Sequence, residues 1–301
     1  MKYIVSAAAL VLVVAWTASG TAPALAQITT ADRPGEQSAP FKPSDLAPNP
    51  QIEVGYVEPR NPAFRPLYDK LKARHVLEDL RAFLSPLRLP RAIQVKVDEC
   101  GSGAAHYRPG GPVIICYESV ETLERTAPDV TLQIGGLPFT KEDAVVGAFV
   151  HVVLHEVARA AFDILEIPVW GREEHAADRV AGYMMFQFGE KVAYRTLVGT
   201  AWFLVQSGVT ISGMPTGEFS YVREVEGGTL QRFYNTLCIA LGGDPARFAF
   251  LSKTLPERRA QGCRWEFVQL QRSFADTFMP HVDRELLKKV QLTEWLPLPA
   301  K

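Results

Sequence analysis

The stretch from His151 to Met185 decides the fold and reads HVVLHEVARAAFDILEIPVWGREEHAADRVAGYMM. Its first part belongs to a segment from Lys141 to Leu165 that is apolar nearly all round, which predicts a helix buried in the core. Pro168 and Gly171 then break the pattern. A second helix is expected from Arg172 to Phe188. The two predicted helices, separated by a short break, carry the polar residues of the candidate site.

The first helix contains His155, Glu156 and Arg159 among apolar neighbours, and the second contains Glu174 and Asp178. Glu174 and Asp178 are four residues apart, so both carboxylates face the same side of their helix. An apolar helix does not bury ionisable side chains without partners, because an unpaired buried charge is costly. We therefore expect these five residues to form one cluster.

The pair His155-Glu156 begins the pattern H-E-x-x-H, in which two histidines four apart on a helix bind zinc. A catalytic zinc takes three protein ligands and activates a water, and the glutamate of the pattern takes the water's proton. On this pattern His155 and Glu174 are the candidate zinc ligands and Glu156 is the candidate catalytic base. Asp178 is expected to orient His155 through its second ring nitrogen.

Arg159 stands where the second histidine of the pattern belongs. It cannot replace that ligand, because a guanidinium stays protonated and has no lone pair to donate. His151 is a candidate replacement ligand, but it would move the metal one helical turn, about 6 Å, and leave Glu156 badly placed. His175 is a second candidate, yet it points about 100° away from Glu174.

The alternative is that Arg159 takes the place of the metal. Its fixed positive charge would then pair with Glu174, Glu156 or both, and zinc would be absent. In this interpretation the fold survives while the chemistry is impaired.

Several separated motifs resemble a bacterial family of zincin-type metallopeptidases of unknown function. They extend over most of the chain between Arg65 and His281. The shared residues are Glu99-Cys100-Gly101, Tyr107, Cys116-Tyr117-Glu118, His155-Glu156, Pro168, Gly171-Arg172-Glu173-Glu174, Ala176-Ala177-Asp178, Gln231-Arg232-Phe233-Tyr234-Asn235, Cys238, Leu255-Pro256, Arg259 and Cys263.

The resemblance implies peptide-bond hydrolysis by a metal-activated water, a peptide or protein as partner, and an edge strand in which His106 and Tyr107 line the cleft. The chain departs from the family pattern at Arg159, in place of histidine, and at His175, in place of an acidic residue. These departures lie nearest the expected chemistry. A noncatalytic relative that binds a peptide or protein in the old cleft is therefore the alternative function.

The expected fold class is α+β: a mainly helical, zincin-like fold with a small antiparallel sheet beside the His155 helix. Ile93, Val95 and Val97 alternate with polar residues, which predicts a strand. A second strand is expected over 113–115, after a tight bend at 110–112. We expect the two strands to pair as a hairpin.

The four cysteines suit an oxidising compartment and allow three pairings. The predicted hairpin would bring Cys100 to Cys116, and two adjoining helices would bring Cys238 to Cys263. A tetrathiolate zinc site is the rival interpretation, but the C-x-x-C spacing that such a site uses is absent.

The first 26 residues are typical of a signal peptide, with Lys2 before an apolar run and a small-x-small site at 24–26. Residues 27–54 are expected to be a flexible tether and residues 55–301 a single metallopeptidase-like domain. The mature chain should be secreted or periplasmic, with no integral membrane segment. A formal net charge of -1 and the lack of a long basic run argue against nucleic acid as a partner.

Overall fold

A computed structural model describes residues 40–101, 105–211 and 228–296. The helices are α1 (Arg65–Ala73), α2 (Val76–Phe83), α3 (Tyr117–Thr126), α4 (Lys141–Ile164), α5 (Glu173–Met185), α6 (Glu190–Ile211), α8 (Thr229–Gly243), α9 (Glu257–Thr277) and α10 (Arg284–Leu292). The strands are β1 (Ile52–Tyr56), β2 (Ile93–Asp98), β3 (His106–Tyr107), β4 (Val113–Cys116), β5 (Leu132–Ile134) and β6 (Leu137–Phe139). The mainly helical α+β class is confirmed.

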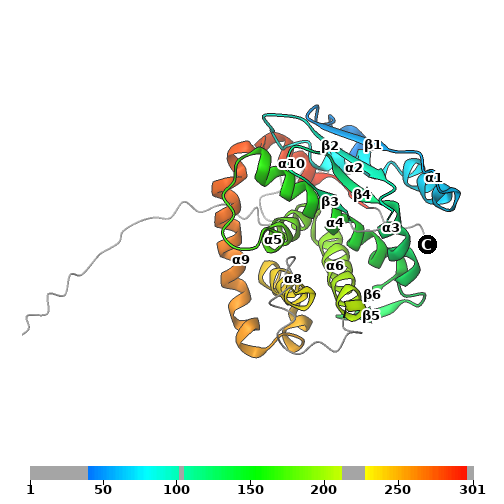
Figure 1. Cartoon of the computed structure of the whole chain (residues 1–301). Coiled ribbons are helices and arrows are strands. Elements are labelled where there is room, and N and C mark those ends of the chain that lie inside the picture. The colour runs from blue at the N-terminus through cyan, green and yellow to red at the C-terminus, as the bar shows by residue number, and fades with distance from the viewer. Residues whose placement is uncertain (1–39, 102–104, 212–227, 297–301) are drawn as a thin grey trace, which may run out of the picture. The chain divides into compact units, whose positions relative to one another are not determined.

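Helix α4 is the central helix of the fold (Figure 1). The side chain of Thr140 accepts a hydrogen bond from the backbone N–H of Asp143, and the Asp143 carboxylate accepts one from the backbone N–H of Thr140. This reciprocal cap satisfies two groups that the first turn would otherwise leave unpaired. By length and composition α4 is also the one described helix that could cross a membrane, but 72% of its apolar window is buried in the fold. It is a core helix.

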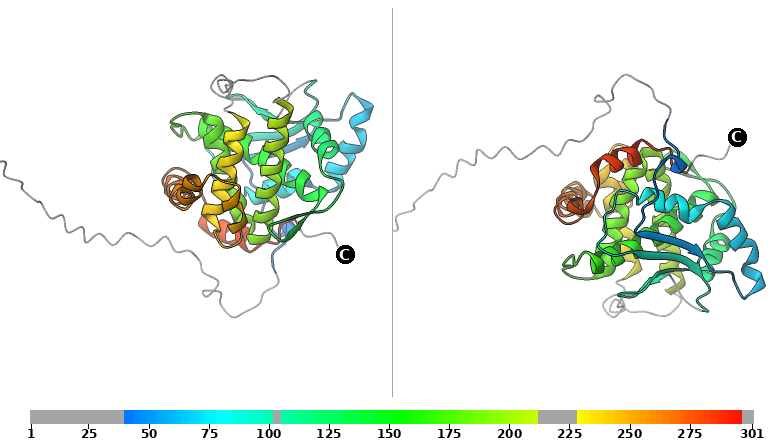
Figure 2. Two further views of the ribbon diagram at one scale, coloured as in Figure 1. Left: turned by 90° about the horizontal axis from the view of Figure 1, so that it is seen from below. Right: turned by 90° about the horizontal axis from the view of Figure 1, so that it is seen from above.

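The helices of the second half of the chain stack in sequence beside α4. Helix α6 packs against α4, α8 packs against α6, and α9 packs against α8. Figure 2 shows α6 and α8 side by side, with α9 seen end-on next to α8 in the left view. The close approach of α4 to α6 is possible because Gly147 faces Gly199, and a Cβ atom on Gly147 would lie only 2.7 Å from the Cα of Gly199.

The main sheet has the strand order β1-β2-β4-β3 and contacts α4 through β3 and β4. Strands β3 and β4 pair antiparallel, and so do β5 and β6, which form a separate two-stranded sheet. The expected hairpin between β2 and β4 is wrong, because these two strands pair parallel. The tight bend at Gly110 instead joins β3 to β4, so that β3 forms the edge of the sheet.

Both disulfides expected from the sequence are present in the structure. Cys238 on α8 bonds to Cys263 on α9 and links the two outer helices. Cys100 follows β2 and bonds to Cys116 at the end of β4. Parallel pairing places Asp98 beside Cys116, so the ends of both strands meet without a hairpin.

The N-terminal part of the described chain packs onto the domain. Strand β1 pairs parallel with β2, and Leu46, Asn49 and Ile52 are buried. Residues 40–54, expected to belong to the tether, therefore contribute to the folded unit, which begins at Pro40. The expected signal peptide and the first part of the tether lie outside the described residues.

Candidate functional site

Helix α4 carries the histidines of the expected cluster on one buried stripe. His151, His155 and Glu156 are 2%, 4% and 5% exposed. Arg159, one turn further along α4, is partly exposed. Helix α5 packs against α4 and adds Glu174 and the buried Asp178. The structure thus brings the expected residues together.

His155 lies between two carboxylates from α5. Its Nε2 is 2.7 Å from Oε2 of Glu174, and its Nδ1 is 2.8 Å from Oδ1 of Asp178. Burial alone would lower the pKa of His155, but hydrogen bonds to Asp178 and Glu174 outweigh it and raise the pKa to about 9. At neutral pH the ring is therefore protonated and donates to both acids.

Arg159 forms ion pairs with the acidic side chains at the outer end of the cluster. Its Nε is 2.8 Å from Oε1 of Glu173 and 3.5 Å from Oε1 of Glu174, and its Nη1 is 3.2 Å from Oε2 of Glu156. One guanidinium therefore contacts three carboxylates, including both that were expected from the sequence. Glu173 was not expected, although it adjoins Glu174 in the sequence.

Glu156 is a buried acid beside two cations. Burial raises its pKa, while the charges of His155 and Arg159 act in the opposite direction. The backbone of Tyr107, in strand β3, also hydrogen-bonds to this carboxylate and lowers its pKa. Edge strand β3 therefore lies directly beside the candidate catalytic base. The hydroxyl of Tyr107 donates to Asp163 of α4 at 2.5 Å.

The sequence reasoning assigned no role to Arg232, which completes the cluster from α8. Its Nε is 2.6 Å from Oδ2 of Asp178 and its Nη2 is 2.7 Å from Oδ1, a bidentate pair. Burial opposes ionisation of Asp178, but the hydrogen bonds from Arg232 and His155 hold its pKa well below the usual range. The only sequence signal for Arg232 was its place in the shared run Gln231–Asn235.

His151 is the buried histidine one turn before His155. Its Nε2 lies 3.3 Å from Oδ1 of Asp178, but neither ring nitrogen makes a hydrogen bond with suitable geometry among the described residues. Burial lowers the pKa of His151, so the ring is neutral. His175 also has a buried Nε2 without a partner in the described part of the chain, and it does not join the contacts of Glu174.

The position expected for the family's zinc lacks a third protein ligand at Arg159, because a guanidinium has no lone pair to donate. The donors that remain there, His155 and Glu174, are hydrogen-bonded to each other, and a guanidinium occupies the space beside them. His151, His155 and Asp178 form a second group whose ligand atoms lie within 4.8 Å of one another. There, however, Arg232 already neutralises Asp178. Cys100, His106 and Cys116 form a third group, but its two sulfurs are joined in a disulfide.

Fold and site together define an α+β protein with a metallopeptidase-type pair of helices, in which Arg159 stands at the position of the second histidine of H-E-x-x-H. A family model described as "Putative metallopeptidase" matches residues 56–277. The chain therefore belongs to that family. No curated protein and no solved structure matches the chain.

Proposed function

We propose that this chain is a secreted or periplasmic member of its metallopeptidase family with an impaired metal site, and that it binds a peptide or protein in the old cleft. The observation that carries the proposal is the contact of the Arg159 guanidinium with Glu156, Glu173 and Glu174. This cation stands at the sequence position of a metal ligand and neutralises the acids that a metal would neutralise.

Peptide-bond hydrolysis in this family would need a metal-bound water and a free carboxylate base. Arg159 supplies no ligand and pairs with the candidate base Glu156. The ligand set His155 and Glu174 is one residue short of the three that a catalytic zinc takes. The chemistry expected from the family is therefore impaired, and zinc is not required to hold the cluster together.

Binding of an extended peptide is supported by the position of β3. Among residues 40–101, 105–211 and 228–296 this strand pairs only with β4, and it forms the edge of the main sheet, next to α4. A sheet edge can accept a peptide as an added strand through backbone hydrogen bonds, and at Tyr107 the peptide would displace the hydrogen bond between this backbone and Glu156. The backbone of Tyr107 in this strand contacts Glu156, and Trp170, in the loop between α4 and α5, is 94% exposed. A large exposed aromatic side chain suits recognition of a peptide or protein.

Export from the cytoplasm is supported by the disulfides. The Cys100–Cys116 and Cys238–Cys263 bonds use all four cysteines and form in oxidising compartments. The signal-peptide pattern of residues 1–26 points to the same compartment.

Metal analysis of the wild type and of the Arg159→His variant, side by side, tests the impaired site. Both proteins are purified without chelator, exposed to zinc and dialysed. We expect no stoichiometric zinc in the wild type and one equivalent in Arg159→His, which is lost again in the double variant Arg159→His/His155→Ala. Stoichiometric zinc in the wild type that disappears in His151→Ala would instead favour a rearranged site. A failure of Arg159→His to gain zinc would contradict the idea that Arg159 replaces the metal.

Peptide binding and cleavage are measured on the same proteins with a pool of quenched fluorescent peptides. The wild type is expected to bind members of the pool without turnover. Turnover by the wild type that persists after removal of trace metal-dependent contaminants, or an absence of any binding, would overturn the proposed function.

A further inference from the structure

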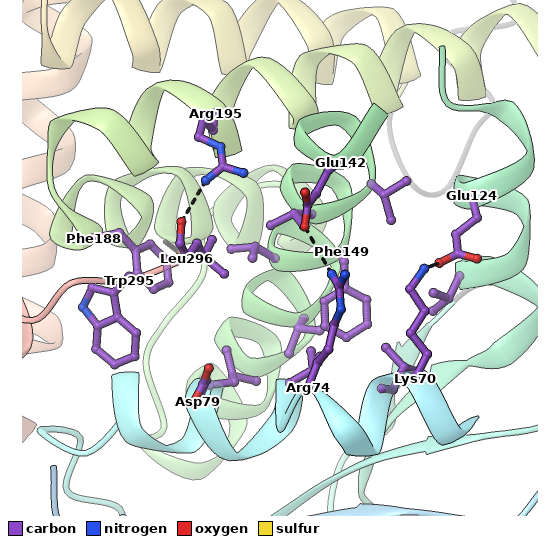
Figure 3. Close-up of a pocket in the computed structure, with 18 of the residues that line it drawn as sticks. Lys70, Arg74, Asp79, Glu124, Glu142, Phe149, Phe188, Arg195, Trp295 and Leu296 are labelled. Atoms are coloured by element: carbon purple, nitrogen blue, oxygen red, sulfur yellow. Dashed lines mark hydrogen bonds and ion pairs between the residues drawn. The ribbon is translucent and has the colours of Figure 1, made fainter. Parts of the chain in front are cut away.

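A large apolar cavity lies on the side of α4 that faces away from His155. Its volume is about 840 Å³, and it is enclosed by α1, α2, α3, α4, α6 and the residues Trp295 and Leu296 (Figure 3). Phe149 and Val153 of α4 line it. The cavity therefore uses a different face of α4 from the His155 cluster and is a separate site.

The walls of the cavity are mainly hydrophobic. Leu80, Val120, Phe149, Phe188 and Trp295 line it, and each is less than 9% exposed. Pockets for small ligands have volumes of roughly 300–1,000 Å³, predominantly apolar walls and a few placed polar groups. The cavity meets the first two conditions, so its charged residues decide which ligand it suits.

Every cation on the wall already has a carboxylate or carbonyl partner. Figure 3 draws the interactions of Lys70 with Glu124, of Arg74 with Glu142 and of Arg195 with Leu296. The pairs are Lys70 with Glu124, Arg74 with Glu142, Lys141 with Asp129, and Arg195 with Asp143 and the carbonyl of Leu296. An anionic ligand would have to break one of these pairs.

Asp79 is the exception among the acids. It lines the cavity from α2, and its carboxylate has no ion pair or hydrogen bond to any described residue. In Figure 3 it lies on the same side of the cavity as Trp295, without a dashed line. Burial raises the pKa of Asp79, and the nearby charge of His75 only partly offsets this effect. A carboxylate that is half-buried and unpaired is complementary to a cation.

We propose that the cavity binds an amphipathic amine, whose apolar body fills the space along Phe149 and whose single ammonium group pairs with Asp79. A neutral apolar ligand would bury Asp79 further without a partner, at a cost in free energy. The ammonium of an amine removes that cost, because a buried charge is tolerated when it is paired and hydrogen-bonded.

Calorimetric titration of the mature wild-type chain at pH 7 with four probes tests this assignment. The probes are dodecylamine, dodecanol, dodecanoate and butylamine, each below its aggregation concentration. Dodecylamine is expected to bind most tightly, because only this probe has both the apolar chain and the cation. Asp79→Asn, which keeps the shape of the side chain, should weaken dodecylamine binding by about tenfold or more. It should not weaken dodecanol binding, because the uncharged amide removes the cost of burying the carboxylate.

Two further variants serve as controls. Glu53→Gln removes an exposed carboxylate on β1 and should not change dodecylamine binding. Val146→Phe adds a ring on the cavity wall and should weaken both long-chain probes. Thermal unfolding of each variant shows whether it is folded, and the Asp79→Asn comparison stands even where Val146→Phe does not fold.

Three results would overturn the proposal: dodecanoate binding as tightly as dodecylamine, equal affinity of Asp79→Asn and wild type for dodecylamine, or tight binding of butylamine. The first would assign the cavity to an anionic amphiphile that displaces a wall carboxylate. None of these results bears on zinc or peptide binding at the His155 cluster, because Asp79 takes no part in that cluster.

Discussion

Asp178 of α5 and Arg232 of α8 form a bidentate ion pair at 2.6 and 2.7 Å, although 54 residues separate them in the sequence. Oδ1 of the same carboxylate lies 2.8 Å from Nδ1 of His155. One buried acid thus connects α4, α5 and α8. Arg232 therefore balances the charge of Asp178 in the inner half of the cluster.

Replacing Arg232 with methionine should destabilise the protein strongly. The side chain of Asp178 is 1% exposed and would keep only its histidine contacts. Removing one partner of a buried ion pair typically costs about 3–5 kcal/mol, because the remaining charge is left uncompensated. Urea unfolding followed by circular dichroism measures the loss.

Arg179→Met is the matched control for that experiment. Arg179 is 42% exposed and lies 3.7 Å from Glu266, so its pair should contribute less than about 1 kcal/mol. If Arg232→Met and Arg179→Met lost the same free energy of unfolding, the Arg232–Asp178 pair would not be a structural element of the core.

Arg159→Met tests whether the arginine has become a structural cation. The side chains of Glu156 and Glu174 are 7% and 18% exposed, and without Arg159 they would face each other with less positive charge nearby. Because the site is partly open to solvent, we expect a loss of about 2 kcal/mol, below the value for a fully buried pair. The free energy of unfolding in urea provides the measurement.

Glu173→Gln removes the exposed partner of the same guanidinium and serves as the comparison. The side chain of Glu173 is 48% exposed, so this change should cost less than about 1 kcal/mol. An Arg159→Met variant with the same free energy of unfolding as the wild type would mean that Glu156 and Glu174 do not depend on the guanidinium.

The two central helices and most of their cluster could be predicted from sequence because the information is local. The apolar run of α4, the breakers Pro168 and Gly171, and the four-residue spacing of Glu174 and Asp178 are all read within one stretch of chain. Helix geometry then fixes which side chains share a face. Contacts within and between two neighbouring helices follow from that geometry.

Arg232 and the direction of the sheet could not be predicted in this way. Arg232 reaches Asp178 from a helix far along the chain, and no local pattern indicates which helix will pack there. The bend at Gly110 is visible in the sequence, but it joins the two-residue strand β3 to β4, and such a short strand has no alternation to reveal it. With β3 inserted, β2 and β4 become parallel.

The two disulfides should make similar contributions to stability. Cys100–Cys116 closes a loop with a sequence separation of 16, and Cys238–Cys263 one of 25. In the chain-entropy model each is worth about 3 kcal/mol, because the cost of loop closure grows only with the logarithm of length. Urea unfolding of the two paired Cys→Ala variants measures each contribution, and reduction of the wild type should cost about as much as both together. A loss of unfolding free energy in only one of the two paired variants would contradict the expectation that both disulfides contribute similarly.

Two glycine-to-alanine substitutions should change the stability of the protein in opposite directions. Gly147 lies at the contact between α4 and α6, and Gly262 lies inside α9. A Cβ atom on Gly147 would lie 2.9 Å from the backbone oxygen of Arg195 and 2.7 Å from the Cα of Gly199, so the helices would have to separate. Overpacking of this kind costs about 1–3 kcal/mol or more. Gly262, inside α9, has only Glu266 Oε1 at 3.8 Å, so Gly262→Ala should instead stabilise the protein by about 0.5–1 kcal/mol through its helix propensity. Thermal unfolding of the two variants should therefore move the melting temperature in opposite directions, and a Gly147→Ala variant as stable as the wild type would show that the two helices do not meet at this glycine pair.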